Sequence, residues 1–154
     1  MSLQLSTSRF GMIDAEEDQV ITLPSGLIGF PEQKRYILKE HKEGSSFLWF
    51  QSVDDGCLAF VVIDPRLFEP AYKIELGPED RAALALNNGG AADEVRTFAI
   101  VNLSGRPPAE VTANLLGPIV INVNKRLAKQ IVLYGSPWSH RHPIPMAEEK
   151  TKAL

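Results

Sequence analysis

A turn signal between two apolar, β-prone segments is the feature that most constrains the fold of this chain. Residues 47–53 read FLWFQSV, residues 57–63 read CLAFVVI, and Asp54, Asp55 and Gly56 separate them. Asp-Gly between two such segments is a strong short-range signal for an antiparallel hairpin. Because both segments are nearly continuous in apolar residues, we expect this hairpin near the centre of the fold, buried on both faces.

Other segments also have the composition of short strands bounded by turn residues. They are residues 19–23, 35–38, 73–76, 96–101, 119–123 and 130–134. One helix is expected over residues 78–86, because Pro78 suits a first helical position and Glu79 and Asp80 favour the positive end of the helix dipole. Residues 87–90, which read NNGG, should end that helix.

Many short strands with a single helix argue against a parallel sheet, because parallel crossovers need helices to cover the sheet. A barrel is the economical arrangement, since it limits exposed sheet edges. We therefore expect a mainly β, antiparallel barrel-like single domain, closed or partly open, with one or two short helices. The domain should span residues 1–135, and residues 136–154, where the strand pattern ends, should form an irregular C-terminal tail.

The size and charge of the chain favour a cytoplasmic protein that binds other proteins. The 154 residues suit one domain, and no apolar run approaches the roughly 18 residues of a membrane span. Residues 1–64 hold ten acidic and five basic side chains, a net of −5, whereas residues 125–154 carry +4. Such an acidic body suits a basic protein partner better than nucleic acid, which needs an excess of positive charge. Solubility alone is the alternative explanation of this imbalance.

The residues that could carry catalysis or bind a metal are few. His140 and His142 could supply two metal ligands, but a third is missing, and His41 is remote in sequence. Cys57 opens an apolar strand without a basic neighbour, so we interpret it as a buried structural thiol. We expect no catalytic site, no metal and no cofactor.

Two groups of residues are candidate partner-binding sites. One group is acidic and is expected in exposed turns: Glu16, Glu17, Asp18, Asp54 and Asp55. The other lies in residues 112–118, where polar side chains precede a Gly-Pro turn: Thr112, Asn114, Leu115 and Pro118. Residues 112–118 have two interpretations: a structured loop in which Asn114 ties down local amides, or an exposed interaction loop.

Several short blocks occur in an order typical of one protein family. They are TSRFG at 7–11 followed by Glu16 and Glu17, ITLPSGLIGF at 21–30, FQS at 50–52, LAF at 58–60 with Asp64, Pro65, Phe68 and Tyr72, TANL at 112–115, GPI at 117–119, IN at 121–122, and QIVL at 130–133. Together these blocks resemble the FliW flagellar assembly factors over residues 7–134. Phe50 stands where Leu is usual in that family, and Gly117 where Ala is common.

The resemblance implies a mainly β, barrel-like protein that is not an enzyme, needs no cofactor and switches between partners. Members of this family bind newly made flagellin in the cytoplasm. When free of flagellin, they bind the translational repressor CsrA, a small basic RNA-binding protein, so that translation of flagellin mRNA resumes. No direct contact with nucleic acid or membrane is expected.

Two other classes of function stay open from the residues alone. Barrel-like β domains can hold flavins, so a cofactor-binding protein is one alternative. An RNA-binding barrel is the other, and it needs aromatic residues interleaved with Lys and Arg on a strand face. Residues 47–50 supply the aromatic residues but no basic ones, and the flanking turn is acidic.

Overall fold

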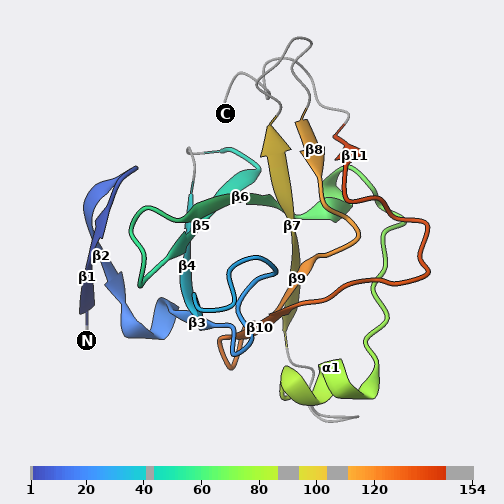
Figure 1. Cartoon of the computed structure of the whole chain (residues 1–154), viewed down its shortest axis with the longest axis horizontal. Coiled ribbons are helices and arrows are strands. Elements are labelled where there is room, and N and C mark those ends of the chain that lie inside the picture. Colours follow the sequence, from blue (N-terminus) through green and yellow to red (C-terminus); the bar gives the residue numbers. More distant parts are fainter. Residues whose placement is uncertain (1, 41–43, 87–93, 104–110, 145–154) are drawn as a thin grey trace.

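The computed structural model describes residues 2–40, 44–86, 94–103 and 111–144. In these residues the chain forms a closed seven-stranded barrel, with a two-stranded hairpin on one side and a short helix at the opposite lower corner (Figure 1). The strands are β1 (Ser2–Thr7), β2 (Gly11–Glu16), β3 (Ile21–Thr22), β4 (Arg35–Glu40), β5 (Phe47–Ser52), β6 (Ala59–Ile63), β7 (Val95–Leu103), β8 (Val111–Ala113), β9 (Ile119–Asn122), β10 (Leu127–Gln130) and β11 (His142–Pro143). The helical elements are η1 (Glu17–Gln19), η2 (Pro65–Leu67) and α1 (Pro78–Ala83).

The barrel closes through strand β7, which pairs with β6 on one side and with β9 on the other. Around the ring the order is β7-β6-β5-β4-β3-β10-β9 and back to β7, while β8 and β11 extend the sheet from β7. Every pair in the ring is antiparallel except β3 with β10, which is parallel. A closed ring with an odd number of strands cannot alternate direction throughout, so one parallel pair is required. The expected mainly β barrel is confirmed, and it is closed.

The barrel interior is filled by apolar side chains from all seven of its strands and from the loop between β3 and β4. Tyr36 and Phe50 stack with their ring centroids 4.5 Å apart, and Phe98 lies beside them in the same cluster. Leu23 and Leu27 reach this cluster from the β3–β4 loop, and their exposed fractions are 0% and 2%. The loop therefore acts as a plug at one mouth of the barrel, as its position in Figure 1 shows.

The hairpin expected around Asp54, Asp55 and Gly56 is confirmed, since β5 and β6 pair antiparallel from Phe47↔Ile63 to Gln51↔Ala59. The expectation about Cys57 is wrong, because this side chain is exposed. The turn that joins the two strands extends from residue 53 to residue 58, so Cys57 lies in the turn and not in the buried strand.

Two expected strands differ from the structure. Residues 73–76 have no strand partner; they cross the outer face of the barrel, where Ile74 packs on Val120 and Ile131. Residues 131–134 lie outside β10, although the amide of Ile131 still donates to the carbonyl of Pro118 at 2.9 Å. Proline has no N–H to return a hydrogen bond, so the regular ladder between β9 and β10 ends there.

The helix begins at Pro78 as expected but ends at Ala83, earlier than residue 86. Ala85 adopts φ +53°, its amide donates to the carbonyl of Ala82 at 3.0 Å, and the amide of Leu86 donates to the carbonyl of Arg81 at 2.9 Å. This pair of hydrogen bonds is a Schellman motif, with Ala in the position usually taken by Gly. The NNGG segment expected to end the helix lies outside the described residues.

The expectation of an irregular tail from residue 136 needs correction for residues 136–144. Trp138 packs edge-on against Tyr72 with ring centroids 5.0 Å apart, β11 pairs with β8, and Ile144 is 8% exposed. The sequence did not predict these contacts, because they depend on single side chains and residues 136–144 show no periodic pattern of apolar residues. Residues 145–154 lie outside the described residues. No helix among the described residues is both long and apolar enough to span a membrane.

Candidate functional site

The N-terminal hairpin carries an acidic surface at its base, where β2 meets η1. Glu16 ends β2, and Glu17 and Asp18 form the first turn of η1; all three are exposed. The amide of Glu16 donates to the side chain of Gln19 at 3.0 Å, which holds the turn in place. Asp14 is exposed on the same face of β2 as Glu16, because side chains two residues apart share a face of a strand. The sequence reasoning missed Asp14, although the alternation of residues 12–16 indicates it.

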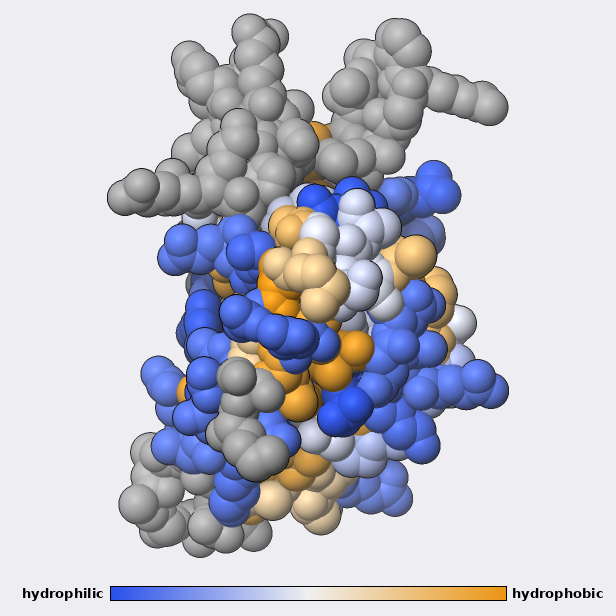
Figure 2. All heavy atoms as spheres, turned by 90° about the vertical axis from the view of Figure 1, so that its left-hand side faces the viewer, coloured by the Kyte–Doolittle hydropathy of each residue, from blue (hydrophilic) through white to orange (hydrophobic). Residues whose placement is uncertain are grey.

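The inner face of the same hairpin is apolar and fixes the acidic surface to the barrel. Leu5 and Ala15 are buried against Ile37 of β4. Figure 2 views the molecule from the hairpin side and shows a mainly hydrophilic outer face with apolar residues gathered in its middle. The acidic groups are therefore presented by a docked element and not by a free arm.

The two acidic candidate segments approach each other around Arg35. The guanidinium of Arg35 binds both carboxylate oxygens of Asp54, at 2.5 Å and 3.1 Å. The hydrogen bond from Arg35 holds the pKa of Asp54 below its usual range. Asp54 and, more weakly, Glu17 raise the pKa of Arg35. Arg35 thus neutralises part of the charge that the sequence assigns to this region.

Asp55 has a structural role in the β5–β6 turn. Its carboxylate accepts a hydrogen bond from the amide of Cys57 at 3.0 Å, and its own amide donates to the hydroxyl of Ser52 at 3.0 Å. Asp55 is half-buried, whereas Asp54 is exposed. Of the five acidic candidates, Glu16, Glu17 and Asp18 are therefore the ones most accessible to a partner.

Thr112 and Ala113 belong to β8, and residues 114–118 form a structured loop and not an exposed one. Thr112 and Pro118 are buried, and Leu115 is 0% exposed. The side-chain oxygen of Asn114 accepts hydrogen bonds from the amides of Leu116 and Gly117, at 3.1 Å and 2.9 Å. The interpretation in which Asn114 ties down local amides is confirmed. Because Leu115 is fully buried, its side chain is not accessible to a partner.

The loop around Asn114 connects to the barrel plug through Gln130. The side chain of Gln130 donates to the carbonyl of Gly117 at 2.9 Å and accepts from the amide of Ile28 at 2.8 Å. Ile28 stands at the tip of the plug and is 66% exposed. Gly26 allows the tight plug, since a Cβ there would lie 2.6 Å from the carbonyl oxygen of Phe30. Three segments that are far apart in the sequence, around Ile28, Gly117 and Gln130, are thus joined by one hydrogen-bond network.

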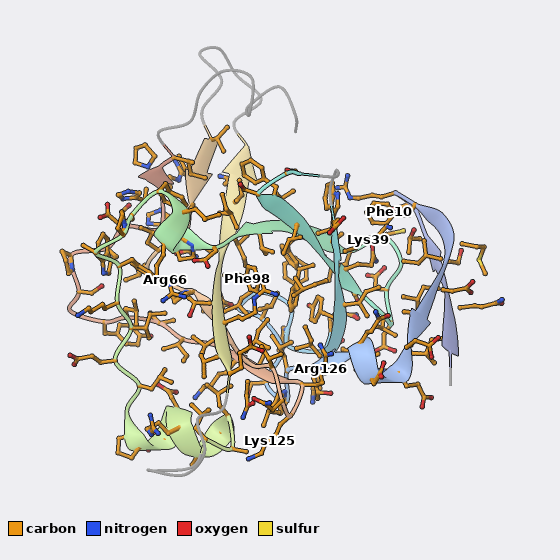
Figure 3. All side chains as sticks on the ribbon, turned by 180° about the vertical axis from the view of Figure 1, so that it is seen from behind. Phe10, Lys39, Arg66, Phe98, Lys125 and Arg126 are labelled. Atoms are coloured by element: carbon orange, nitrogen blue, oxygen red, sulfur yellow. The ribbon has the colours of Figure 1, made fainter. Side chains whose placement is uncertain are left out.

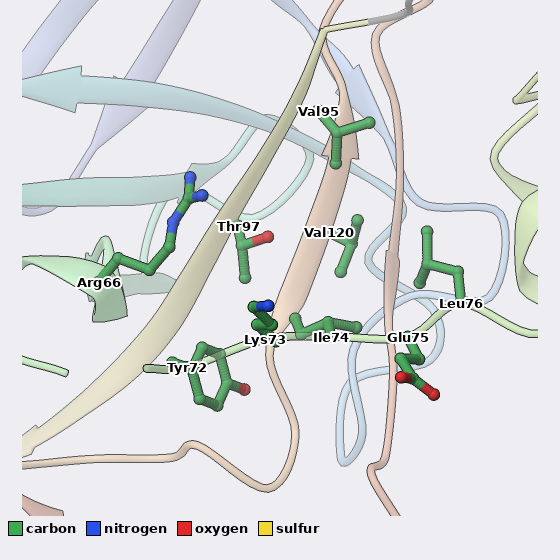
Figure 4. A pocket seen from close by; sticks show the side chains of 9 residues that line it. All are labelled: Arg66, Tyr72, Lys73, Ile74, Glu75, Leu76, Val95, Thr97 and Val120. Atoms are coloured by element: carbon green, nitrogen blue, oxygen red, sulfur yellow. The ribbon is translucent and has the colours of Figure 1, made fainter. Parts of the chain in front are cut away.

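A groove of about 330 Å³ lies on the outer face of β7 and β9, beneath residues 72–76 (Figure 4). Val95, Thr97 and Val120 form its floor, and Arg66 and Lys73 stand at its rim. The groove has exposed cations at its rim and an aliphatic floor. The residues that line it do not bring an acid, a base and a nucleophile together as a catalytic site requires. Among the described residues, no three His, Cys, Asp or Glu side chains come together as a metal site requires.

Two tyrosine hydroxyl groups are buried in the packed parts of the molecule. The hydroxyl of Tyr72 donates to the carbonyl of Leu115 at 2.7 Å, and burial raises the pKa of this phenol. Burial also raises the pKa of Tyr36 to about 12, with a smaller contribution from Asp55. Both phenols are therefore neutral at physiological pH. This fold and these surfaces define a class: a small closed β-barrel with a docked, charged N-terminal hairpin.

Comparison with known proteins identifies the family within that class. Residues 4–144 match the family described as FliW protein. The flagellar assembly factor FliW of Syntrophus aciditrophicus is 42% identical over 92% of this chain and 87% of its own length. The corresponding protein of Geobacter sulfurreducens is 40% identical over 98% of this chain and 92% of its own length. The chain belongs to the FliW family.

A solved structure supports the same assignment. A crystal structure of the flagellar assembly factor FliW superimposes with a TM-score of 0.82 at 30% identity, covering 96% of this chain and 99% of that one. The matched region extends to residue 144, which agrees with the packing of Trp138 and Ile144 against the domain.

Proposed function

We propose that this chain is a cytoplasmic flagellar assembly factor that acts without catalysis, by binding one of two partner proteins. It binds flagellin and, when free of flagellin, binds CsrA and antagonises it. Repression of flagellin mRNA translation is thereby relieved. The observation that carries this proposal is the nearly full-length match to the FliW family, whose relatives are named flagellar assembly factors.

The electrostatics of the hairpin base support binding of a basic partner such as CsrA. Asp14, Glu16, Glu17 and Asp18 are all exposed there, on a docked element. Exposed charge pairs contribute little net affinity, commonly under about 1 kcal/mol each, but they accelerate the encounter of oppositely charged surfaces. The same negative field disfavours the approach of RNA phosphates. The anchoring energy is then expected from apolar and main-chain contacts.

A competition experiment with purified proteins tests the proposal. The chain, CsrA and flagellin from one organism are mixed in pairs and as a trio, and complexes are resolved by size-exclusion chromatography with light scattering. We expect a complex with each partner, and we expect flagellin to displace CsrA. A mobility-shift assay with the flagellin mRNA leader should show that the chain releases this RNA from CsrA. Failure to bind either partner would refute the proposal.

A charge-reversal variant tests the role of the hairpin base. Glu16→Lys with Glu17→Lys should slow association with CsrA about tenfold at low salt and weaken its salt dependence, with little change in dissociation. The matched control, Glu75→Lys with Glu79→Lys, changes the net charge equally at exposed positions on the α1 side of the molecule. Surface plasmon resonance at two salt concentrations measures both rates. If both variants associate equally fast, the hairpin base has no steering role.

A further inference from the structure

The opposite end of the hairpin brings together two cations and two aromatic rings from three segments of the chain. The guanidinium carbon of Arg9 lies 4.6 Å from the ring centre of Trp49, and Lys39 Nζ lies 5.1 Å from that of Phe10. The rings of Phe10 and Trp49 meet edge to face, with centroids 5.8 Å apart. We call Arg9, Phe10, Lys39 and Trp49 the basic-aromatic tip. Figure 3 shows Phe10 and Lys39 side by side where the hairpin turn meets β4.

This tip is held rigidly. The hydroxyl of Thr7 donates to the carbonyl of Gly11 at 2.8 Å and accepts from the amide of Phe10 at 2.9 Å. The amide of Ser8 donates to the carbonyl of Gly56 at 3.1 Å, which ties the hairpin turn to the β5–β6 turn. Arg9 and Phe10 are therefore held against the barrel before any partner arrives, which lowers the entropic cost of binding.

The tip carries positive charge, although the part of the sequence that forms it is acidic overall. The tip belongs to residues 1–64, which hold ten acidic and five basic side chains, yet among the described residues neither Arg9 nor Lys39 has a carboxylate within ion-pair distance. A guanidinium that stacks on an indole keeps its edge N–H groups available to an anion. Arg and Trp are also the residue types most enriched at the energetic centres of protein interfaces. Two unneutralised cations beside two rings fit a carboxylate and an apolar side chain.

We infer that the basic-aromatic tip is a binding surface for an acidic peptide segment of a partner protein, one in which carboxylates alternate with apolar side chains. A carboxylate would lie between Arg9 and Lys39, and the adjacent apolar side chain would cover Phe10. Single-stranded RNA is less suited, because two cations neutralise only about two phosphates, and the hairpin base repels the rest of the strand. The six residues of β2 place this tip about 17 Å from the acidic base, so the two surfaces are separate.

Nuclear magnetic resonance with defined probes tests this inference at millimolar concentration. The probes are a short peptide alternating Glu with Leu and Phe, the same peptide with Lys in place of Glu, and oligouridylate. We expect the Glu peptide to shift the indole N–H signal of Trp49 and the amides of residues 8–11, while the Lys peptide does not. Trp138→Phe assigns the two indole signals.

Variants separate charge from structure in that experiment. Arg9→Gln with Lys39→Gln should weaken binding of the Glu peptide about tenfold, whereas the control Lys34→Gln with Arg141→Gln, which removes as much charge elsewhere, should not. Urea midpoints verify that both variants fold. Absence of any shift at Trp49 would overturn the inference, as would equal shifts with the Lys peptide. Tighter binding of oligouridylate at the tip would reassign the surface to RNA.

Discussion

The attachment of the hairpin to the barrel depends on the absence of a side chain at Gly56. A Cβ built there would overlap the carbonyl oxygen of Ser6 and would lie 3.0 Å from the carbonyl carbon of Ser6 and 3.3 Å from Cα of Thr7. These are main-chain atoms, so no side-chain rotation relieves the clash. Gly56→Ala must therefore push β1 away from the β5–β6 turn.

The cost of this displacement can be bounded in two ways. Inserting a methyl group into a closely packed site costs about 1–3 kcal/mol. If the hairpin detached instead, the burial of Leu5, which is 6% exposed, would be lost, at about 1.5–3 kcal/mol for such a side chain. Both estimates predict that Gly56→Ala lowers the free energy of unfolding by about 2 kcal/mol.

Urea denaturation and hydrogen exchange measure this effect. We expect a lower urea midpoint, faster exchange of the amides of β1 and β2, and a changed emission of Trp49, which loses its contact with Phe10. Gly77→Ala is the control, since nothing lies within 4 Å of a Cβ there and φ is −72°; as an N-cap change it should cost under about 1 kcal/mol. If Gly56→Ala costs no more than the control and the hairpin keeps its protection, the steric argument is wrong.

The remaining predictions concern four single substitutions. Tyr72→Phe should cost about 1–2 kcal/mol in urea denaturation, because a buried carbonyl loses its donor, whereas Tyr36→Phe should cost under about 0.5 kcal/mol, since no described protein atom pairs with its hydroxyl. With a folded pKa of about 12 against about 10 unfolded, Tyr36 also lowers stability as pH rises through that window, so Tyr36→Phe should unfold at higher pH than the wild type. Ala85→Gly should raise the free energy of unfolding by about 0.5–1 kcal/mol, because glycine adopts φ +53° without strain. Thermal denaturation should show this as a higher midpoint, and an unchanged midpoint would contradict the argument. Asp54→Asn should cost under about 1 kcal/mol at neutral pH, given its exposure, and the difference from wild type should vanish in acid, because the lowered pKa of Asp54 contributes stability only above its folded value.

Local patterns determined the elements whose partners are adjacent in the chain. The turn at Asp54, Asp55 and Gly56 predicted the β5–β6 hairpin, because a two-stranded pair needs only its own turn chemistry and an apolar, β-prone segment on each side of it. Pro78 likewise marked the start of α1. The mainly β barrel class followed from many strands and few helices, and the order of short blocks indicated the FliW family.

Longer-range packing decided what those patterns could not. Residues 73–76 have the alternation of a strand, but a strand also needs an edge to pair with, and β7, β9 and β10 already pair with one another beneath them. Pro118 ended a ladder that the composition of residues 130–134 alone would continue. The burial of Leu115 depends on Tyr72 and Ser139, which are distant in sequence.

For the candidate surfaces too, some features were evident from the sequence and others depend on tertiary contacts. The sequence by itself identified the exposed acids Glu16, Glu17 and Asp18, because runs of charge beside a turn remain solvated in almost any fold. It could not reveal that Arg35 neutralises Asp54, nor that Arg9 and Lys39 come to lie on Phe10 and Trp49. Those contacts join residues up to 40 positions apart, and only the docking of the hairpin onto β4 and β5 brings them within reach.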